Sequence, residues 1–208
     1  MIESATGIIL RTRPLTETSV IVNWLTPNLG RVSTVAKGAR RPKSPFAGKL
    51  DLFYIADFMF TRSQRSELHV LREMKLRELN SPLREEMGWL KQACYAAALI
   101  EQATERETPL PAIYNLMRGL LDHLPQHPPQ PRTTYAFELK LLDELGMRPD
   151  LDDSKLPIAT STLLVALLES DWNELASLTA TATQARELHQ FLHGFLIYHL
   201  GKIPKGRA

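Results

Sequence analysis

The spacing of apolar residues changes its period once along this chain, near residue 80, and that change limits the folds available to it. Before residue 80, short segments rich in β-branched residues recur, and 31–37 alternates its side chains with a period of two. After residue 80, apolar residues recur at helical spacing. The pattern predicts an α+β chain of two domains, with a β-rich part over 1–80 and an all-α part over 81–208.

The first part contains five predicted strands. They cover the segments 6–12, 19–25, 31–37, 52–61 and 66–76. A compact turn at 28–31 joins the second strand to the third, and the longest irregular connection follows the third strand. This spacing is typical of a small barrel, of which the OB-fold is the commonest form. An SH3-like barrel has nearly the same pattern, so periodicity alone leaves both open.

The second part contains five or six predicted helices. The first is predicted over 81–107, with Ser81 as its N-cap and Pro82 at its first position. The others are predicted over 112–124, 133–146, 160–170, 171–178 and 183–201. Gly146 and Gly201 stand where a glycine commonly ends a helix.

Charge is divided unevenly between the two parts. The net charge is only +2, but residues 1–80 hold 13 basic and 7 acidic side chains, whereas residues 81–208 hold 12 and 16. Five cations and no acid occur within 36–50, in the connection after the third strand: Lys37, Arg40, Arg41, Lys43 and Lys49. These positive charges repel each other unless an anion is present, which favours a polyanion as the partner of this loop.

Residues outside the loop extend this interpretation. Three arginines from neighbouring strands or turns are expected to prolong the basic surface: Arg11, Arg13 and Arg31. Four aromatic residues lie on the next strand, several of them necessarily in the core: Phe53, Tyr54, Phe58 and Phe60. Basic side chains beside stacking rings suit single-stranded nucleic acid, and phosphate contacts alone also permit a duplex. A solvated loop, an RNA ligand or an acidic protein partner stay open as alternatives.

Nothing in the sequence is typical of an enzyme. The phosphate-binding and nucleophile motifs GxxxxGK[ST], GxGxxG and GxSxG are absent. His189 and His193 are four residues apart but lack the acid of a metal-binding HExxH, and His123 and His127 are expected in a loop. Cys94 is expected to be buried on the apolar face of its helix. We therefore expect no catalytic residue, no cofactor and no metal.

The ends and the single cysteine bear on location. The chain has no run of eighteen apolar residues, and its first ten residues lack the basic and apolar regions of a secretory signal. One cysteine excludes an internal disulfide. A cytoplasmic protein is expected.

Residues 7–53 also contain a specific series of motifs, "GIIL", "ETS", "GR" and "KGARRPKS", closed by Leu50 and Phe53. This block resembles the N-terminal signature of RecO, a family of bacterial recombination mediators. The matching positions are Gly7, Glu17, Thr18, Thr26, Gly30, Arg31, Lys37, Gly38, Arg40, Arg41, Ser44, Leu50 and Phe53. Residues 137–152 resemble the second landmark of the family, and residues 195–207 resemble its closing helix.

The resemblance implies an OB-fold followed by a helical domain, in a protein of DNA repair that is associated with the nucleoid. It implies binding of single- and double-stranded DNA and annealing of complementary strands. It also implies help to RecA in loading onto DNA coated with single-strand binding protein. The implied protein partners are RecR and the C-terminal tail of single-strand binding protein, with RecA as an indirect partner.

Charge clustering and the resemblance together predict the site residues. Six are predicted to bind DNA: Arg11, Arg31, Lys37, Arg40, Arg41 and Lys43. Three are predicted to meet the acidic tail of single-strand binding protein: Lys202, Lys205 and Arg207. Many relatives carry a four-cysteine zinc insert after the second landmark, but residues 149–164 contain no cysteine, so the resemblance implies no zinc here.

Overall fold

The computed structural model describes residues 1–151 and 155–207, which form two compact units. The first comprises Met1–Ser81 and Thr104–Asn115, and the second comprises Pro82–Ala103 and Leu116–Ala208. The sequence assigns all of 81–208 to the helical part, whereas Thr104–Asn115 belongs to the unit that contains the strands. Backbone hydrogen bonds explain this, because the Glu107 and Leu110 N–H groups donate to the carbonyls of Arg31 and Pro27 at 3.1 Å each.

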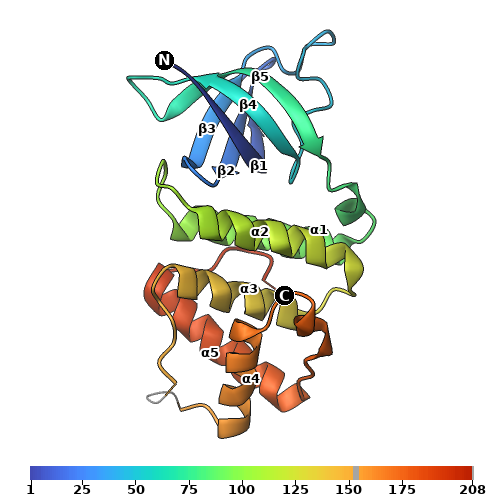
Figure 1. Cartoon of the computed structure of the whole chain (residues 1–208), viewed down its shortest axis with the longest axis vertical. Helices are drawn as coiled ribbons and strands as arrows, with labels where there is room; N and C mark the ends of the chain where they lie inside the picture. The colour runs from blue at the N-terminus through green and yellow to red at the C-terminus, as the bar shows by residue number, and fades with distance from the viewer. Residues whose placement is uncertain (152–154, 208) are drawn as a thin grey trace. The chain divides into compact units, whose positions relative to one another are not determined.

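Five strands form a closed barrel in the first unit (Figure 1). They are β1 (Ile2–Pro14), β2 (Val20–Thr26), β3 (Gly30–Ala36), β4 (Ile55–Thr61) and β5 (Leu68–Glu78). Their order around the barrel is β1-β2-β3-β5-β4, and β4 pairs with β1 to close it. The β3–β5 pairing is parallel and the others are antiparallel. This arrangement is that of the OB-fold, and it decides between the two barrels that periodicity left open.

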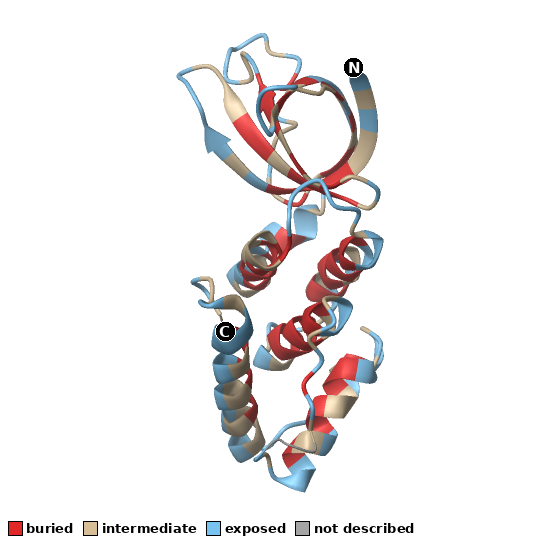
Figure 2. Ribbon diagram, turned by 90° about the vertical axis from the view of Figure 1, so that its left-hand side faces the viewer, coloured by how far each residue is buried: buried red, intermediate tan, exposed pale blue. Residues whose placement is uncertain are grey.

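β1 is longer than its predicted segment because it pairs with two strands. Its residues Ile2–Ile8 pair with β4, and Ile8–Pro14 pair with β2 across an irregularity between Ile9 and Arg11. Alternate side chains of the strands fill the barrel, where the Trp24 ring stacks on Phe58 with centroids 4.1 Å apart. The Trp24 indole N–H donates to the Thr34 hydroxyl at 2.8 Å, so the buried polar group is satisfied. Figure 2 shows the buried stretches of the barrel strands in red.

The described part of the chain contains five α-helices. They are α1 (Met87–Ala103), α2 (Pro111–His123), α3 (Pro131–Glu144), α4 (Ile158–Glu169) and α5 (Ala182–Leu200). Short 3₁₀ turns occupy Ser81–Arg84, Leu124–Gln126 and Glu174–Ser177. The leucine-rich faces of α3, α4 and α5 form one core, which includes Leu139, Leu164 and Leu192. None of the helices in the part of the chain described here is long and apolar enough to cross a membrane.

The helix ends agree with some predictions and correct others. Gly146, one residue beyond the C-cap of α3, and Gly201, the C-cap of α5, adopt left-handed φ values of 71° and 74°, as predicted. The predicted start at Ser81 is wrong for the α-helix, since Ser81–Arg84 forms a 3₁₀ turn and α1 begins at Met87. His123 is the buried last residue of α2, so it lies in the helix predicted over 112–124 and not in the loop expected for it.

Cys94 is exposed on α1, contrary to the expectation of burial. The buried residues of α1 include Ala93, Ala96 and Ala97, and Cys94 lies on the opposite stripe with the exposed Lys91. Residues three apart share a helix face, so Lys91 marks the solvent side on which Cys94 falls.

Candidate nucleic-acid interface

Two loops meet at one end of the barrel. The registers pair Pro14 with Val20 and Val20 with Ala36, so the loop after β1 (15–19) and the loop after β3 (37–54) lie at the same end. The Arg40 N–H donates to the Thr18 carbonyl at 3.0 Å and joins them. We call these two loops, with the last residues of β1, the basic end.

The loop over 37–54 is folded rather than extended. Consecutive turns close it, with N–H groups of Arg41, Ser44, Ala47 and Lys49 each donating to a carbonyl three residues earlier. The Phe46 side chain enters the barrel core and is 6% exposed. A loop anchored by a buried ring presents its remaining side chains from a defined base.

Most charges of this loop point to solvent. Four cations are exposed and Lys49 is half-buried; the exposed four are Lys37, Arg40, Arg41 and Lys43. Arg11 and Arg13 lie three residues and one residue before Pro14, and both are exposed on β1. Five exposed cations therefore gather at the basic end, and Arg11 lies further along β1, opposite Asn23 in the middle of β2. Exposed cations gathered in this way suit the binding of phosphate.

Arg31 does not belong to this group. It is the second residue of β3 and pairs with Leu25, near the opposite end of the barrel. Its Nε donates to the Thr104 hydroxyl at 2.8 Å, and its guanidinium also donates to the Thr104 carbonyl. The structure thus gives Arg31 the role of holding Thr104–Asn115 on the barrel, instead of the predicted place on a DNA-binding face.

A network of ion pairs occupies the end of the barrel opposite to the basic end. Arg62 pairs with Glu3 at 2.6 Å and with Glu107, while Arg106 pairs with Glu67. The hydrogen bond from Arg62 lowers the pKa of the Glu3 carboxyl. OB-folds commonly bind ligands through the loop between strands 4 and 5, but here that loop already holds Thr104–Asn115.

His69 is the buried member of this network. The Ser63 N–H donates to its Nδ1 at 3.2 Å, which places the ring proton on Nε2. Nε2 then donates to the Glu107 carboxylate at 2.8 Å. His69 is 1% exposed, whereas the Glu107 side chain is 33% exposed, so the network runs from the barrel interior to the surface.

The aromatic residues are mainly structural. Phe53, Phe58 and Phe60 are at most 1% exposed, which removes them as platforms for a ligand. Tyr54 is half-buried and keeps part of its surface open at the basic end. Of the four rings in the prediction, Tyr54 is the one with access to solvent.

The basic C-terminus differs from its prediction in one residue. Lys202 and Lys205 are exposed, but the Arg207 side chain is 7% exposed and forms an ion pair with Glu138 at 2.7 Å. A guanidinium that is buried against a carboxylate is neutralised by it and is not accessible to a partner. Arg207 is therefore a structural residue of the helical unit.

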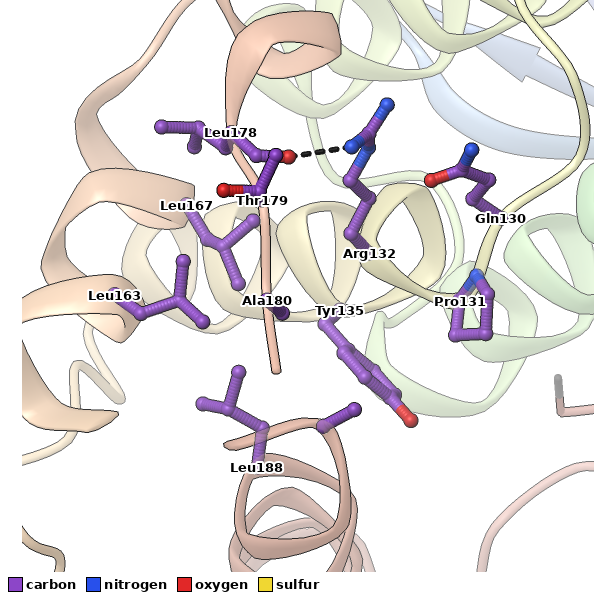
Figure 3. A pocket seen from close by; sticks show the side chains of 11 residues that line it. Gln130, Pro131, Arg132, Tyr135, Leu163, Leu167, Leu178, Thr179, Ala180 and Leu188 are labelled. Carbon is purple, nitrogen blue, oxygen red and sulfur yellow. Dashed lines mark hydrogen bonds between the residues drawn. The ribbon is translucent and has the colours of Figure 1, made fainter. Parts of the chain in front are cut away.

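The helical unit contains a pocket of about 330 Å³ (Figure 3). Leu163, Leu167 and Leu188 form its apolar wall, and Tyr135 and Arg132 from α3 lie beside them. Arg132 donates to the carbonyls of Leu178 and Ala176, the latter at 3.0 Å. Sequence reasoning missed this site, because its charged member bonds to carbonyls more than forty residues away.

Comparison with known proteins identifies the family. The model of "Recombination protein O N terminal" matches residues 1–80, and that of "Recombination protein O C terminal" matches residues 90–156. The chain belongs to the RecO family. It is 28% identical to "DNA repair protein RecO" of Anaeromyxobacter dehalogenans over 95% of this chain and 91% of that one. For the RecO protein of Alkaliphilus metalliredigens the identity is 25%, over 98% and 96%.

Family membership makes this a protein of DNA repair and recombination. For RecO of Rhodopirellula baltica, identity reaches 32% over 69% of this chain and 53% of the relative.

The predicted lack of a zinc insert concerns residues 149–164, of which 152–154 lie outside the described residues. Within 1–151 and 155–207, no three His, Cys, Asp or Glu side chains gather as metal ligands would. His189 instead lies against Tyr135, whose hydroxyl is 3.3 Å from its Nδ1.

Proposed function

We propose that this RecO-family chain binds single- and double-stranded DNA through its basic end and anneals complementary strands there. The observation that carries the proposal is the gathering of five exposed cations at one end of the barrel, with Arg11 further along β1 on the same strand as Arg13. Two DNA strands repel each other through their phosphates, and a surface that binds both lowers this repulsion while counterions are released. Annealing of this kind needs no catalytic group, so we propose that the protein is not an enzyme and uses no cofactor.

We further propose that the protein acts on the nucleoid, with RecR, to help RecA displace single-strand binding protein from DNA. Membership of a DNA repair family supports this role. So does the presence of two surfaces of different chemistry, a basic one on the barrel and an apolar pocket in the helical unit. The first suits phosphate and the second suits a short protein segment.

For the tail of single-strand binding protein we propose the pocket beside Arg132 as the main site. An acidic peptide with an apolar tip needs an apolar cavity with a cation next to it. Leu163, Leu167 and Leu188 supply the cavity, and the Arg132 guanidinium supplies the charge. This proposal replaces the basic C-terminus as the anchor, because Arg207 is buried, and gives Lys202 and Lys205 a peripheral role.

The DNA proposal is tested by replacing the four exposed loop cations, Lys37, Arg40, Arg41 and Lys43, with alanine. We expect weaker binding to all sequences. We also expect the slope of log affinity against log salt for single strands to fall by about 3, since each phosphate contact contributes about 0.7. Fluorescence anisotropy across a salt series measures both quantities.

The matched control removes four exposed cations elsewhere: Arg65, Arg72, Lys75 and Lys91. An equal effect of the control would attribute binding to overall charge, and an unchanged slope in the loop variant would contradict the proposal. RNA of matched sequence and an acidic protein domain are measured in parallel. Tighter binding of either would favour the corresponding alternative function.

The pocket proposal is tested with a labelled tail peptide of single-strand binding protein. Arg132→Gln removes the charge and keeps a donor for the carbonyls of Leu178 and Ala176, and we expect it to weaken peptide binding at least about tenfold. Binding to bare DNA should stay unchanged. Lys202→Ala with Lys205→Ala is the control, for which we expect a smaller loss; the reverse order of the two effects would return the site to the basic C-terminus.

A further inference from the structure

A second pocket opens at the basic end, beneath the loop over 37–54. Its volume is about 420 Å³, within the range of small-ligand sites. Val20, Ala39 and Leu50 contribute apolar surface. Tyr54 contributes an aromatic ring, Arg40 a cation and Asp51 an anion. All of these residues belong to the barrel unit.

The backbone fixes the position of Tyr54 in this pocket. The Ile9 N–H donates to the Tyr54 carbonyl at 3.0 Å, and the Phe53 N–H donates to the Ile9 carbonyl at 2.8 Å. Phe53 itself adopts a left-handed φ of 64°, unusual for a bulky residue, and the Asn80 side chain donates to its carbonyl at 2.7 Å. The main chain that carries the ring is therefore fixed before any ligand arrives, which lowers the entropic cost of stacking on the ring.

The charges in and around the pocket select which part of a nucleotide enters. Cations lie on the loop above it, where Arg40 reaches the lining. Asp51, whose Oδ1 accepts from the Leu52 N–H at 2.8 Å, also lines the pocket. A carboxylate repels phosphate but accepts hydrogen bonds from the N–H groups on a base edge. The base therefore fits inside, while the phosphates fit on the loop.

We propose that this pocket takes one unpaired nucleobase of a single strand, stacked on Tyr54, while Lys37, Arg40, Arg41 and Lys43 follow the neighbouring phosphates. The inference rests on the proposed function and specifies how the basic end distinguishes one strand from two. A base in a duplex enters only after it is unpaired and unstacked, at a cost of a few kcal/mol, so the pocket favours single strands. Pairing with a complementary strand then withdraws the base and releases the product.

The full chain is tested against an oligothymidylate, the same backbone carrying abasic sites, and a duplex of equal length. We expect Tyr54→Leu to weaken binding of the intact single strand about 5- to 150-fold, the range for loss of one base-stacking contact. Its affinity for the duplex, its affinity for the abasic strand and its salt slope should match those of the wild type. Tyr54→Phe should retain wild-type binding.

Two further measurements keep the proposal testable if Tyr54→Leu fails to fold. The wild type should bind the abasic strand more weakly than the intact strand, and Ala39→Phe, which fills the pocket from the loop side, should remove that difference. Equal binding of intact and abasic strands by the wild type would overturn the proposal. So would equal losses on both strands in a variant that keeps the folded circular dichroism spectrum of the wild type. If the salt slope of DNA binding is smaller in the variant without the four loop cations than in the wild type, the result overturns the base pocket alone. If the wild type binds no DNA, the proposed function fails as well.

Discussion

At the scale of single residues, the Arg207–Glu138 pair ties the end of the chain to the helical unit. Arg207 donates to both carboxylate oxygens of Glu138, at 2.7 and 2.8 Å, and Glu138 is fully buried. The Tyr95 hydroxyl donates to the same carboxylate, and burial together with the charge of Glu138 raises the pKa of Tyr95, so it stays a donor. Every strong acceptor of Glu138 thus has a partner, which is the condition for burying a charge.

Removing one member of this pair should be costly. We expect Arg207→Ala to reduce the free energy of unfolding of the helical unit by about 3–5 kcal/mol, because it leaves the Glu138 charge buried without its cation. Urea unfolding followed by circular dichroism measures the loss. Lys205→Ala, two residues away and exposed, should change it by less than about 0.5 kcal/mol.

The double substitution of Glu138 and Arg207 by leucine should recover most of the loss, since no unpaired charge remains. An Arg207→Ala variant as stable as the Lys205→Ala control would show that the pair contributes little. The same pair affects the design of partner experiments: truncation at Gly201 removes Arg207 and would confuse a loss of folding with a loss of binding.

At the scale of elements, the short segment Thr104–Asn115 is fastened to the barrel at a close approach to Gly30. Gly30 has a left-handed φ of 64°, and a Cβ on it would lie 1.8 Å from the Thr108 carbonyl oxygen. The predicted turn at 28–31 requires a glycine for its conformation alone. The structure adds a second requirement, because the backbone of Thr108 occupies the space of the missing side chain.

Two glycine substitutions separate these requirements. Gly48→Ala meets only the conformational penalty, about 1–2 kcal/mol, because φ is 70° and nothing lies within 4 Å of the new Cβ. Gly30→Ala should lose more than Gly48→Ala, since it also displaces Thr104–Asn115. Thermal unfolding and amide exchange of residues 104–110 are the measurements. Equal losses for the two variants would mean that the close approach is unimportant.

The loop over 37–54 shows how far an element can be predicted from local patterns. Its position after the third strand, its exposed cations and the glycine turns at Gly38 and Gly48 follow from local composition. Its anchoring does not. Phe46 is one aromatic residue in a polar segment, and its burial depends on a vacancy in the barrel core that other strands create. The predicted strand over 52–61 begins three residues late for a similar reason, because Phe53 takes a left-handed φ between two hydrogen-bonded neighbours.

At the scale of the whole molecule, the sequence predicts two parts, and the described structure shows two units with separate hydrophobic cores. The excess of basic residues in 1–80 coincides with the barrel, while the acidic excess lies in 81–208. A distribution of this kind directs a polyanion to the barrel and away from the helices. It therefore supports the placement of DNA at the basic end, whatever the detailed contacts.

The sequence by itself determined the class of fold, the helix ends at Gly146 and Gly201, the family and the concentration of cations in 36–50. These depend on residue type, local periodicity and short-range turn geometry. The tertiary structure decided the closure of the barrel and the burial of Arg207. It also decided the hydrogen bonds by which Arg31 holds Thr104–Asn115 on the barrel, and the partial exposure of Tyr54. Each of these depends on partners far away in the sequence, whose proximity exists only after the strands and helices have packed, and no local pattern records it.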